Sequence, residues 1–200
     1  MKKIVLLASF FIGLAAFTHI NGYKPGDKAI DFSLKNINGK MVSLADYKAA
    51  KGFIVIFTTN HCPFAIKYQE RINALNKKYE SKGYPVIAIN PNDSTISPVD
   101  SYSNMIIRAK EEHFSFPYLL DGSQDIAKAY GATKTPHVYL LQKSNDGLIV
   151  KYTGAIDDNT EDAAAVNKKY VELAVDALLA GKEVSITSTK AIGCGIKWKQ

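Results

Sequence analysis

The chain has few of the residues that the commonest catalytic motifs require. It contains only two cysteines, Cys62 and Cys194, and only two arginines, Arg71 and Arg108, among its 200 residues. It has no glycine-rich phosphate loop, no Ser-His-Asp order and no paired-carboxylate signature. The sequence therefore gives no support to phosphate-loop, serine-triad or paired-carboxylate chemistry, and neither a cofactor nor a metal ion is expected.

Long apolar runs and clustered basic charge are also lacking. The apolar stretch 4–17 is too short to span a bilayer comfortably, so no stable membrane span is expected. With Lys2 and Lys3 before it, this stretch predicts a signal peptide over 1–19 and a periplasmic or extracellular protein, in a compartment where disulfides persist. The net charge of +6 falls to about +4 once these two lysines are removed, and the remaining lysines are scattered, which excludes a basic nucleic-acid stripe.

The order of the expected elements is that of an α/β domain. Two continuous apolar runs, 53–57 and 86–89, predict buried parallel strands, and apolar residues at helical spacing predict a helix over 62–80 between them. The other expected elements are, in chain order, a hairpin across Asn38-Gly39, a helix from near Pro98, a helix from Ser123 to Tyr130, a hairpin across 145–147 and a helix over 166–178. We expect one domain over 23–181, followed by a tail over 182–200.

Cys62 is the most informative residue of the chain. It follows the strand 53–57 and precedes Pro63, which suits the first turn of a helix. The cysteine is therefore expected at the helix cap, where unpaired N–H groups and the helix dipole stabilise a thiolate. This position predicts a redox nucleophile. The alternative interpretation is a small buried residue at the end of a strand.

The order of these elements resembles the thioredoxin fold, and within it the redoxin branch, the alkyl-hydroperoxide-reductase/thiol-specific-antioxidant family. The resemblance extends from Tyr23 to Gly181. The motifs that carry it are Lys24-Pro25-Gly26-Asp27, Asp31-Phe32-Ser33-Leu34, Asn38-Gly39-Lys40, Cys62-Pro63, Ile87-Ala88-Ile89-Asn90 and Thr135-Pro136. The runs 60–64, 89–93 and 193–198 resemble a narrower, peroxiredoxin-like subgroup. The family implies a central mixed β-sheet with helices on both faces, preceded by an N-terminal β-hairpin extension.

The resemblance also implies a chemical role for Cys62, as the nucleophile that attacks a disulfide or a peroxide. The second cysteine of the usual motif is replaced by Ala65, so a mixed disulfide on Cys62 has no local partner. Thr59 matches the Thr or Ser that peroxiredoxins place three residues before the cysteine, whereas Val55 replaces their proline. His61 either assists the thiolate as a charge or proton carrier, or is an exposed residue in the position that thioredoxins give to tryptophan.

Substrate binding is implied for four residues around the cysteine. Thr135-Pro136 occupies the position of the cis proline that faces the active cysteine in this fold, and the residue before it can bind a peptide as an added strand. Read without the family, Thr-Pro is merely a turn. Pro63 and Phe64, directly after the cysteine, complete the predicted substrate-binding set.

Cys194 is the candidate resolving thiol because it is the only other cysteine. It lies between Gly193 and Gly195 in the tail, and three outcomes stay open: a bridge within the chain, a bridge to a second chain, or a free or purely structural thiol.

Three functional hypotheses follow from these residues. The first is an exported thiol oxidoreductase that acts on protein disulfides or peroxide and is served by an external thiol reductant. The second is a non-enzymatic, thioredoxin-like binding module with a structural Cys62–Cys194 disulfide. The third is a metal or cofactor carrier with Cys62 as a ligand, beside His61 and His137.

Overall fold

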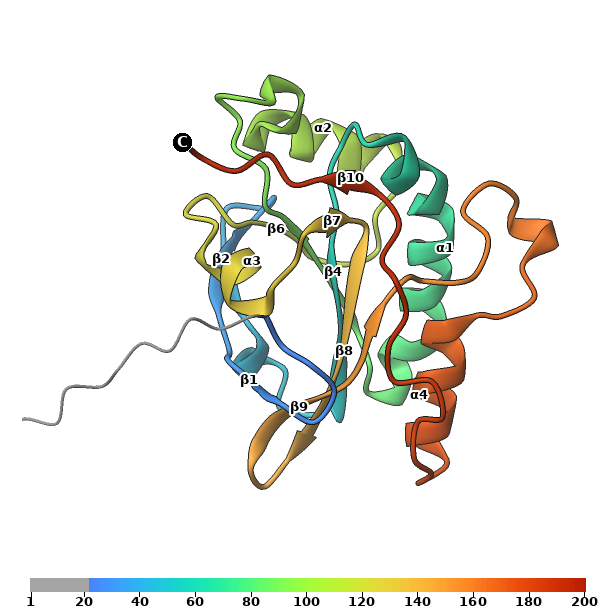
Figure 1. Ribbon diagram of the computed structural model, residues 1–200. Coiled ribbons are helices and arrows are strands. Elements are labelled where there is room, and N and C mark those ends of the chain that lie inside the picture. The colour runs from blue at the N-terminus through green and yellow to red at the C-terminus, as the bar shows by residue number, and fades with distance from the viewer. Residues whose placement is uncertain (1–21) are drawn as a thin grey trace, which may run out of the picture.

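The computed structural model describes residues 22–200 (Figure 1). The predicted signal peptide, 1–19, lies outside these residues. A mixed eight-stranded sheet has the order β1-β9-β8-β4-β5-β6-β2-β3, and a separate pair joins β7 to β10. The strands are β1 (Lys28–Ala29), β2 (Ser33–Asn36), β3 (Met41–Ser43), β4 (Gly52–Phe57), β5 (Val86–Asn90), β6 (Tyr118–Leu120), β7 (Lys134–Thr135), β8 (His137–Ser144), β9 (Gly147–Gly154) and β10 (Cys194–Gly195).

The central strands explain the two continuous apolar runs of the sequence. Strands β4, β5 and β6 are parallel, and β8 pairs antiparallel with β4. Every residue of β4 and β5 is buried, because both faces of the sheet are covered. Ile54 and Ile56 enter one core cluster, while the alternate residues Phe53, Val55 and Phe57 enter the other.

Helices lie on both faces of this sheet, as predicted. They are α1 (Pro63–Tyr79), α2 (Tyr102–Glu111), α3 (Asp125–Tyr130) and α4 (Tyr170–Leu179). Helices α1, α2 and α4 pack against one face, and α3 packs against the other together with the N-terminal segment around Tyr23 and Phe32 (Figure 1). The expected N-terminal hairpin is also present: β2 pairs antiparallel with β3 across a turn in which Gly39 takes a φ of +83°.

Three helices begin later than the sequence predicts. The segment after Pro98 is a single 3-10 turn, and α2 starts only after Ser101, whose extended backbone and side chain cap it. Helix α3 follows Gln124 rather than Ser123. Helix α4 starts at Tyr170 instead of 166, because the residues before it are bonded to Asp158: its carboxylate accepts the N–H of Asn167 (3.0 Å), and its N–H donates to the carbonyl of Lys168 (3.1 Å).

The tail 182–200 is docked against the domain. Thr153 donates its N–H to the carbonyl of Thr187 (3.1 Å) and accepts one from Thr189 (3.0 Å), so the tail runs beside the end of β9. Further along, β10 pairs with β7, and Ile196 is buried in the core cluster on the α3 side of the sheet. Figure 1 shows this segment in red, running from α4 past β7 toward α3. Within residues 22–200, no helix is both long and apolar enough to cross a membrane.

Candidate active site

Cys62 caps helix α1, as the sequence predicts. Strand β4 ends at Phe57, and the short loop that follows places Cys62 in an extended conformation immediately before Pro63, the first residue of the helix. No side chain caps the helix there, so its first N–H groups face the cysteine. The Cys62 side chain is completely buried. The buried sulfur thus lies at the N-terminal end of α1, where the sequence analysis expects the candidate nucleophile.

Thr59 holds the loop that carries the cysteine. Its hydroxyl oxygen accepts the N–H of Cys62 at 3.3 Å, and the threonine itself is buried. The position predicted from peroxiredoxins is therefore occupied by a residue that fixes the turn through the backbone of Cys62. The structure brings Thr59 and Cys62 together.

His61 is held by a residue that the sequence analysis missed. Its Nδ1 lies 2.7 Å from the carboxylate of Asp100, and about a third of the imidazole remains exposed, at 37%. Asp100 is fully buried and also accepts the N–H of Asn60 (2.9 Å), the amide of Asn92 (2.7 Å) and the hydroxyl of Ser97 (2.8 Å). One carboxylate thus fixes the loop before Cys62 and the ring beside it.

The two cysteines form a disulfide. The Cα atoms of Cys62 and Cys194 are 6.0 Å apart, within the range that such a bond needs. The bond lies within one chain, as it would for either a resolving or a purely structural Cys194, so the resolving role stays a prediction. The closed loop spans 132 residues, so the tail must return across the whole domain to make the bond.

The residues on the other side of the disulfide are those predicted for substrate binding. The Thr135–Pro136 peptide bond is cis, and the carbonyl oxygen of Thr135 lies 3.1 Å from the sulfur of Cys62. Thr135 also pairs, as part of β7, with Cys194 of β10. The strand position at which an incoming peptide is expected is therefore filled by the chain's own tail.

Phe64 lines a pocket that Thr135 and Pro136 do not line. This surface pocket of about 550 Å³ is also lined by Ala155, Thr189 and Ile192. Ile192 stands two residues before Cys194 and is about half exposed, at 51%. Phe64 is thus close to the segment that leads into the disulfide, whereas the exposed Pro63 serves as the first residue of α1.

Neither arginine serves this site. Arg71 forms an ion pair with Asp157 (2.7 Å), and Arg108 bonds to Gln69 (2.6 Å) and pairs with Glu112. Within residues 22–200, no group of three or more His, Cys, Asp or Glu side chains is arranged to hold a metal ion.

His137 follows the cis proline but belongs to the sheet. Its Nε2 lies 3.2 Å from the hydroxyl of Thr153, and its ring packs against that of Tyr139, with centroids 4.8 Å apart. Burial lowers the pKa of His137 to about 4, because the charged imidazolium would lose its hydration. The ring is therefore neutral at pH 7.

Comparison with known proteins identifies relatives of this chain in sequence and in structure. The sequence is 29% identical over 163 residues to the thiol-disulfide oxidoreductase ResA of Bacillus cereus, which covers 76% of this chain and 88% of that protein. An uncharacterized conserved protein of Geobacillus kaustophilus has 38% identity and a TM-score of 0.82, covering 90% of this chain and 94% of its own. The thioredoxin domain of a thiol-disulfide oxidoreductase of Bacteroides vulgatus, with 17% identity, a TM-score of 0.53 and coverage of 64% and 88%, shares the fold. The profile of the AhpC/TSA family matches residues 25–161, well over half of the sequence, and the chain belongs to that family.

Proposed function

We propose that this protein is a two-cysteine thiol-disulfide oxidoreductase, in which Cys62 is the nucleophile and Cys194 the resolving thiol. The observation that carries the proposal is the disulfide between them, formed at a helix N-terminus and opposite a cis proline. The ResA relatives, which are thiol-disulfide oxidoreductases by name, support the same class of reaction.

The first half of the cycle reduces a substrate disulfide. The Cys62 thiolate attacks one sulfur of the substrate, a new S–S bond forms, and the other substrate sulfur leaves as a thiolate. The thiolate of Cys194 then attacks the sulfur of Cys62 and releases the second substrate thiolate. Two electrons have passed to the substrate, and the enzyme holds the Cys62–Cys194 bond. Cys194 takes this part because Ala65 stands where the usual motif has its second cysteine.

The second half restores the dithiol and needs an external thiol reductant. Cys62 is fully buried in the oxidised form, whereas Cys194 is partly exposed. The reductant thiolate therefore attacks Cys194, and Cys62 leaves as the thiolate that the helix N-terminus stabilises. A second thiol of the reductant then releases Cys194 and becomes oxidised to a disulfide.

Peroxide is the second candidate substrate for the same nucleophile. The AhpC/TSA match and the position of Thr59 favour it. Both arginines are engaged elsewhere, so no guanidinium is at hand to stabilise the developing charge on a peroxide oxygen. For this reason we place disulfide exchange first. A peroxide reaction would convert Cys62 to a sulfenic acid. The thiol of Cys194 would then condense with that sulfenic acid to form the disulfide and release water.

Export is part of the proposal. The lysines at positions 2 and 3 and the apolar stretch 4–17 support a cleaved signal peptide. An exported enzyme would work where its internal disulfide persists between reductions.

Stopped-flow kinetics tests the choice of substrate. Reduced protein is mixed with hydrogen peroxide, and separately with hydroxyethyl disulfide, while loss of the Cys62 thiol is followed. We expect the disulfide to react faster. A faster peroxide reaction would make the protein a peroxidase, and reaction with neither would favour a binding module whose disulfide is structural.

A further inference from the structure

Beyond the disulfide, hydrogen bonds to Lys197 and Lys199 also hold the tail on the domain. The N–H of Lys197 donates to Asn92 Oδ1 at 2.9 Å, and the carbonyl of Lys197 accepts from the N–H of Asp93 at 3.0 Å. Gln124 Nε2 donates to the same carbonyl at 2.8 Å, and Gln124 Oε1 accepts the N–H of Lys199 at 2.7 Å. All four bonds reach main-chain atoms of the tail. They recognise an extended backbone and leave both lysine side chains exposed.

The groups that hold the tail are built into the domain. Asn92 and Gln124 are buried, at 4% and 1% exposed. Asn92 is oriented by Asp100, and Gln124 Nε2 also donates to the carbonyl of Pro91 at 2.7 Å. Gln124 adopts a φ of 65°, a conformation that residues other than glycine rarely take. When the tail leaves, these atoms are exposed and are free to accept or donate the same hydrogen bonds to water or to another extended backbone.

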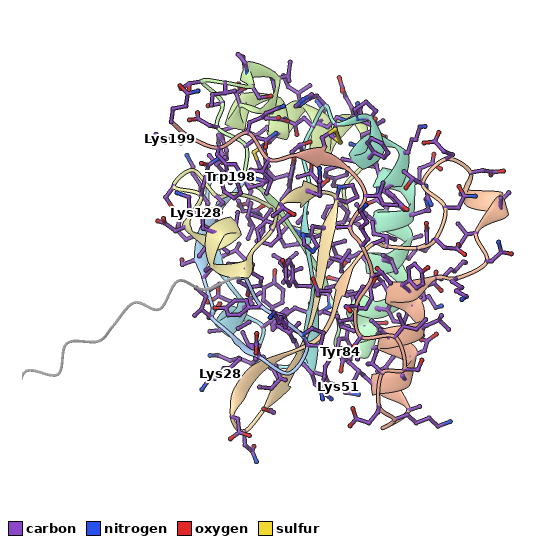
Figure 2. All side chains as sticks on the ribbon, in the orientation of Figure 1. Lys28, Lys51, Tyr84, Lys128, Trp198 and Lys199 are labelled. Carbon is purple, nitrogen blue, oxygen red and sulfur yellow. A yellow bond between two sulfur atoms is a disulfide. The ribbon has the colours of Figure 1, made fainter. Side chains whose placement is uncertain are left out.

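Where the tail pairs with β7, Gly193 makes a close contact with Thr135 that a residue with a side chain could not make. A Cβ atom there would lie 2.1 Å from the carbonyl oxygen of Thr135, whereas a Cβ at Gly195 would meet nothing within 4 Å. Two residues after Cys194, Ile196 is buried in the core cluster, and Trp198 packs at its edge. Figure 2 labels Trp198 against the body of the molecule and Lys199 farther out. The docked segment thus has a glycine before its cysteine and apolar residues, Ile196 and Trp198, two and four positions after it.

We propose that this strand groove, formed by 133–135, Asn92, Asp93 and Gln124, binds an extended cysteine-bearing segment of a protein substrate, and that the tail is its built-in competitor. The inference rests on the proposed disulfide exchange at Cys62. While the tail is docked, Cys62 is buried and the groove is full. A protein disulfide therefore reaches Cys62 only in molecules whose tail has left. The segment it presents has a glycine before its cysteine and an apolar residue two positions after it.

A peptide that copies the tail tests the proposal on the full-length protein. The peptide carries residues 191–199, with its cysteine joined to thionitrobenzoate as a mixed disulfide. The protein carries Cys194→Ser, which prevents the internal bond. The Cys62 thiolate attacks the peptide sulfur, forms a protein–peptide disulfide and releases coloured thionitrobenzoate.

Gly193→Ala and Gly195→Ala, each added to Cys194→Ser, form a matched pair. Both remove a glycine beside position 194, but only the first places a methyl group against Thr135. We expect Gly193→Ala to raise the rate with the peptide by about tenfold, since the rate scales with the fraction of molecules whose tail has left. Gly195→Ala should stay within about twofold of its parent.

Trp198, the only tryptophan of the chain, reports the tail directly. Its emission should shift to the red in Gly193→Ala and not in Gly195→Ala. Unchanged emission in Gly193→Ala, or shifted emission with an unchanged peptide rate, overturns the inference.

A second peptide, with alanine in place of the glycine before its cysteine, tests the groove itself. With the Gly193→Ala protein, this peptide should react at least about fivefold more slowly than the first peptide, because its methyl group meets the carbonyl of Thr135. Equal rates overturn the assigned binding position. Hydroxyethyl disulfide needs no strand pairing, so it distinguishes failure of the proposed function from failure of this inference. If no variant reacts with it, the proposed function fails. If all variants react with it while the peptides show no difference, only the inference about the tail fails.

Discussion

The main chain of Cys194 pairs antiparallel with that of Thr135, and its sulfur is bonded to Cys62. The residue before the cis proline therefore holds in place the same residue that closes the disulfide. A cysteine on an extended substrate would approach Cys62 along this strand. On our proposal, resolution by the tail and docking of a substrate are two uses of one position, and they follow each other in the catalytic cycle.

The two cysteines should have separable roles. Cys62→Ser should abolish disulfide reductase activity, because no other thiol stands at a helix N-terminus. Cys194→Ser should still consume about one equivalent of hydroxyethyl disulfide and then stall, with steady-state turnover lowered by about tenfold or more. Mass spectrometry of the stalled protein should find the mixed disulfide on Cys62. Undiminished turnover by Cys194→Ser would mean that an external thiol performs the resolving step.

The oxidised enzyme should be attacked at Cys194 by its reductant. Its sulfur belongs to a partly exposed residue, while that of Cys62 is buried beneath the tail. Brief treatment of oxidised protein with glutathione, followed by acid quenching and peptide mapping, should place the adduct on Cys194. The Cys62 thiol should appear free in the same molecules. An adduct found mainly on Cys62 would contradict this order of events.

Local sequence signals predicted the side of the site that is built from consecutive residues. The apolar run of β4, followed by Cys62 and Pro63, specifies a buried strand and then a helix that starts at the cysteine. Thr135-Pro136 was placed opposite the cysteine by family resemblance, and in the structure the carbonyl oxygen of Thr135 lies 3.1 Å from the sulfur of Cys62. These features depend on backbone preferences and on core burial, which are encoded within a few residues.

Long-range polar contacts were not predictable in this way. Asp100 reaches His61 from 39 positions further along the chain, and no spacing in the sequence distinguishes it from a surface aspartate. The tail 182–200 shows no periodicity, yet its backbone is held by β7 and by Gln124. Nothing in the sequence indicates that Gly193 is needed for the close contact with Thr135 that the structure shows. Such contacts depend on the assembled fold.

Asp100→Asn should disturb both the loop before Cys62 and the ring of His61. The two carboxylate oxygens of Asp100 serve four partners, which are Asn60, Asn92, Ser97 and His61. An asparagine amide has only one acceptor oxygen, and its NH₂ group would face groups that are themselves donors. We expect a loss of about 2 kcal/mol in the free energy of unfolding. We also expect the Cys62 thiol to react about tenfold more slowly with hydroxyethyl disulfide.

Comparing the rate with the stability separates a positioning role from a general loss of stability. If Asp100 positions the loop before Cys62, Asp100→Asn should slow the reaction with hydroxyethyl disulfide even at a temperature at which circular dichroism shows the variant fully folded. Asp146→Asn, in the exposed turn between β8 and β9, should leave both the rate and the stability as they are. A parental rate at reduced stability would assign Asp100 a structural part alone.

His137 should make the fold sensitive to acid. Its pKa is lowered by burial from 6.5 to about 4, so below pH 6.5 the unfolded chain binds a proton that the folded chain does not. Stability from this residue is complete above about pH 6.5 and is lost as the pH falls toward 4, by about 3 kcal/mol over that range. Urea unfolding at pH 7.5 and at pH 4.5 should show this loss in the parent and a loss smaller by about 2 to 3 kcal/mol in His137→Phe, which keeps a buried ring beside Tyr139 without a titrating group. Equal losses in the two proteins, or an NMR titration that places the protonation of the His137 ring near pH 6.5, would show that the imidazole is hydrated in the folded state.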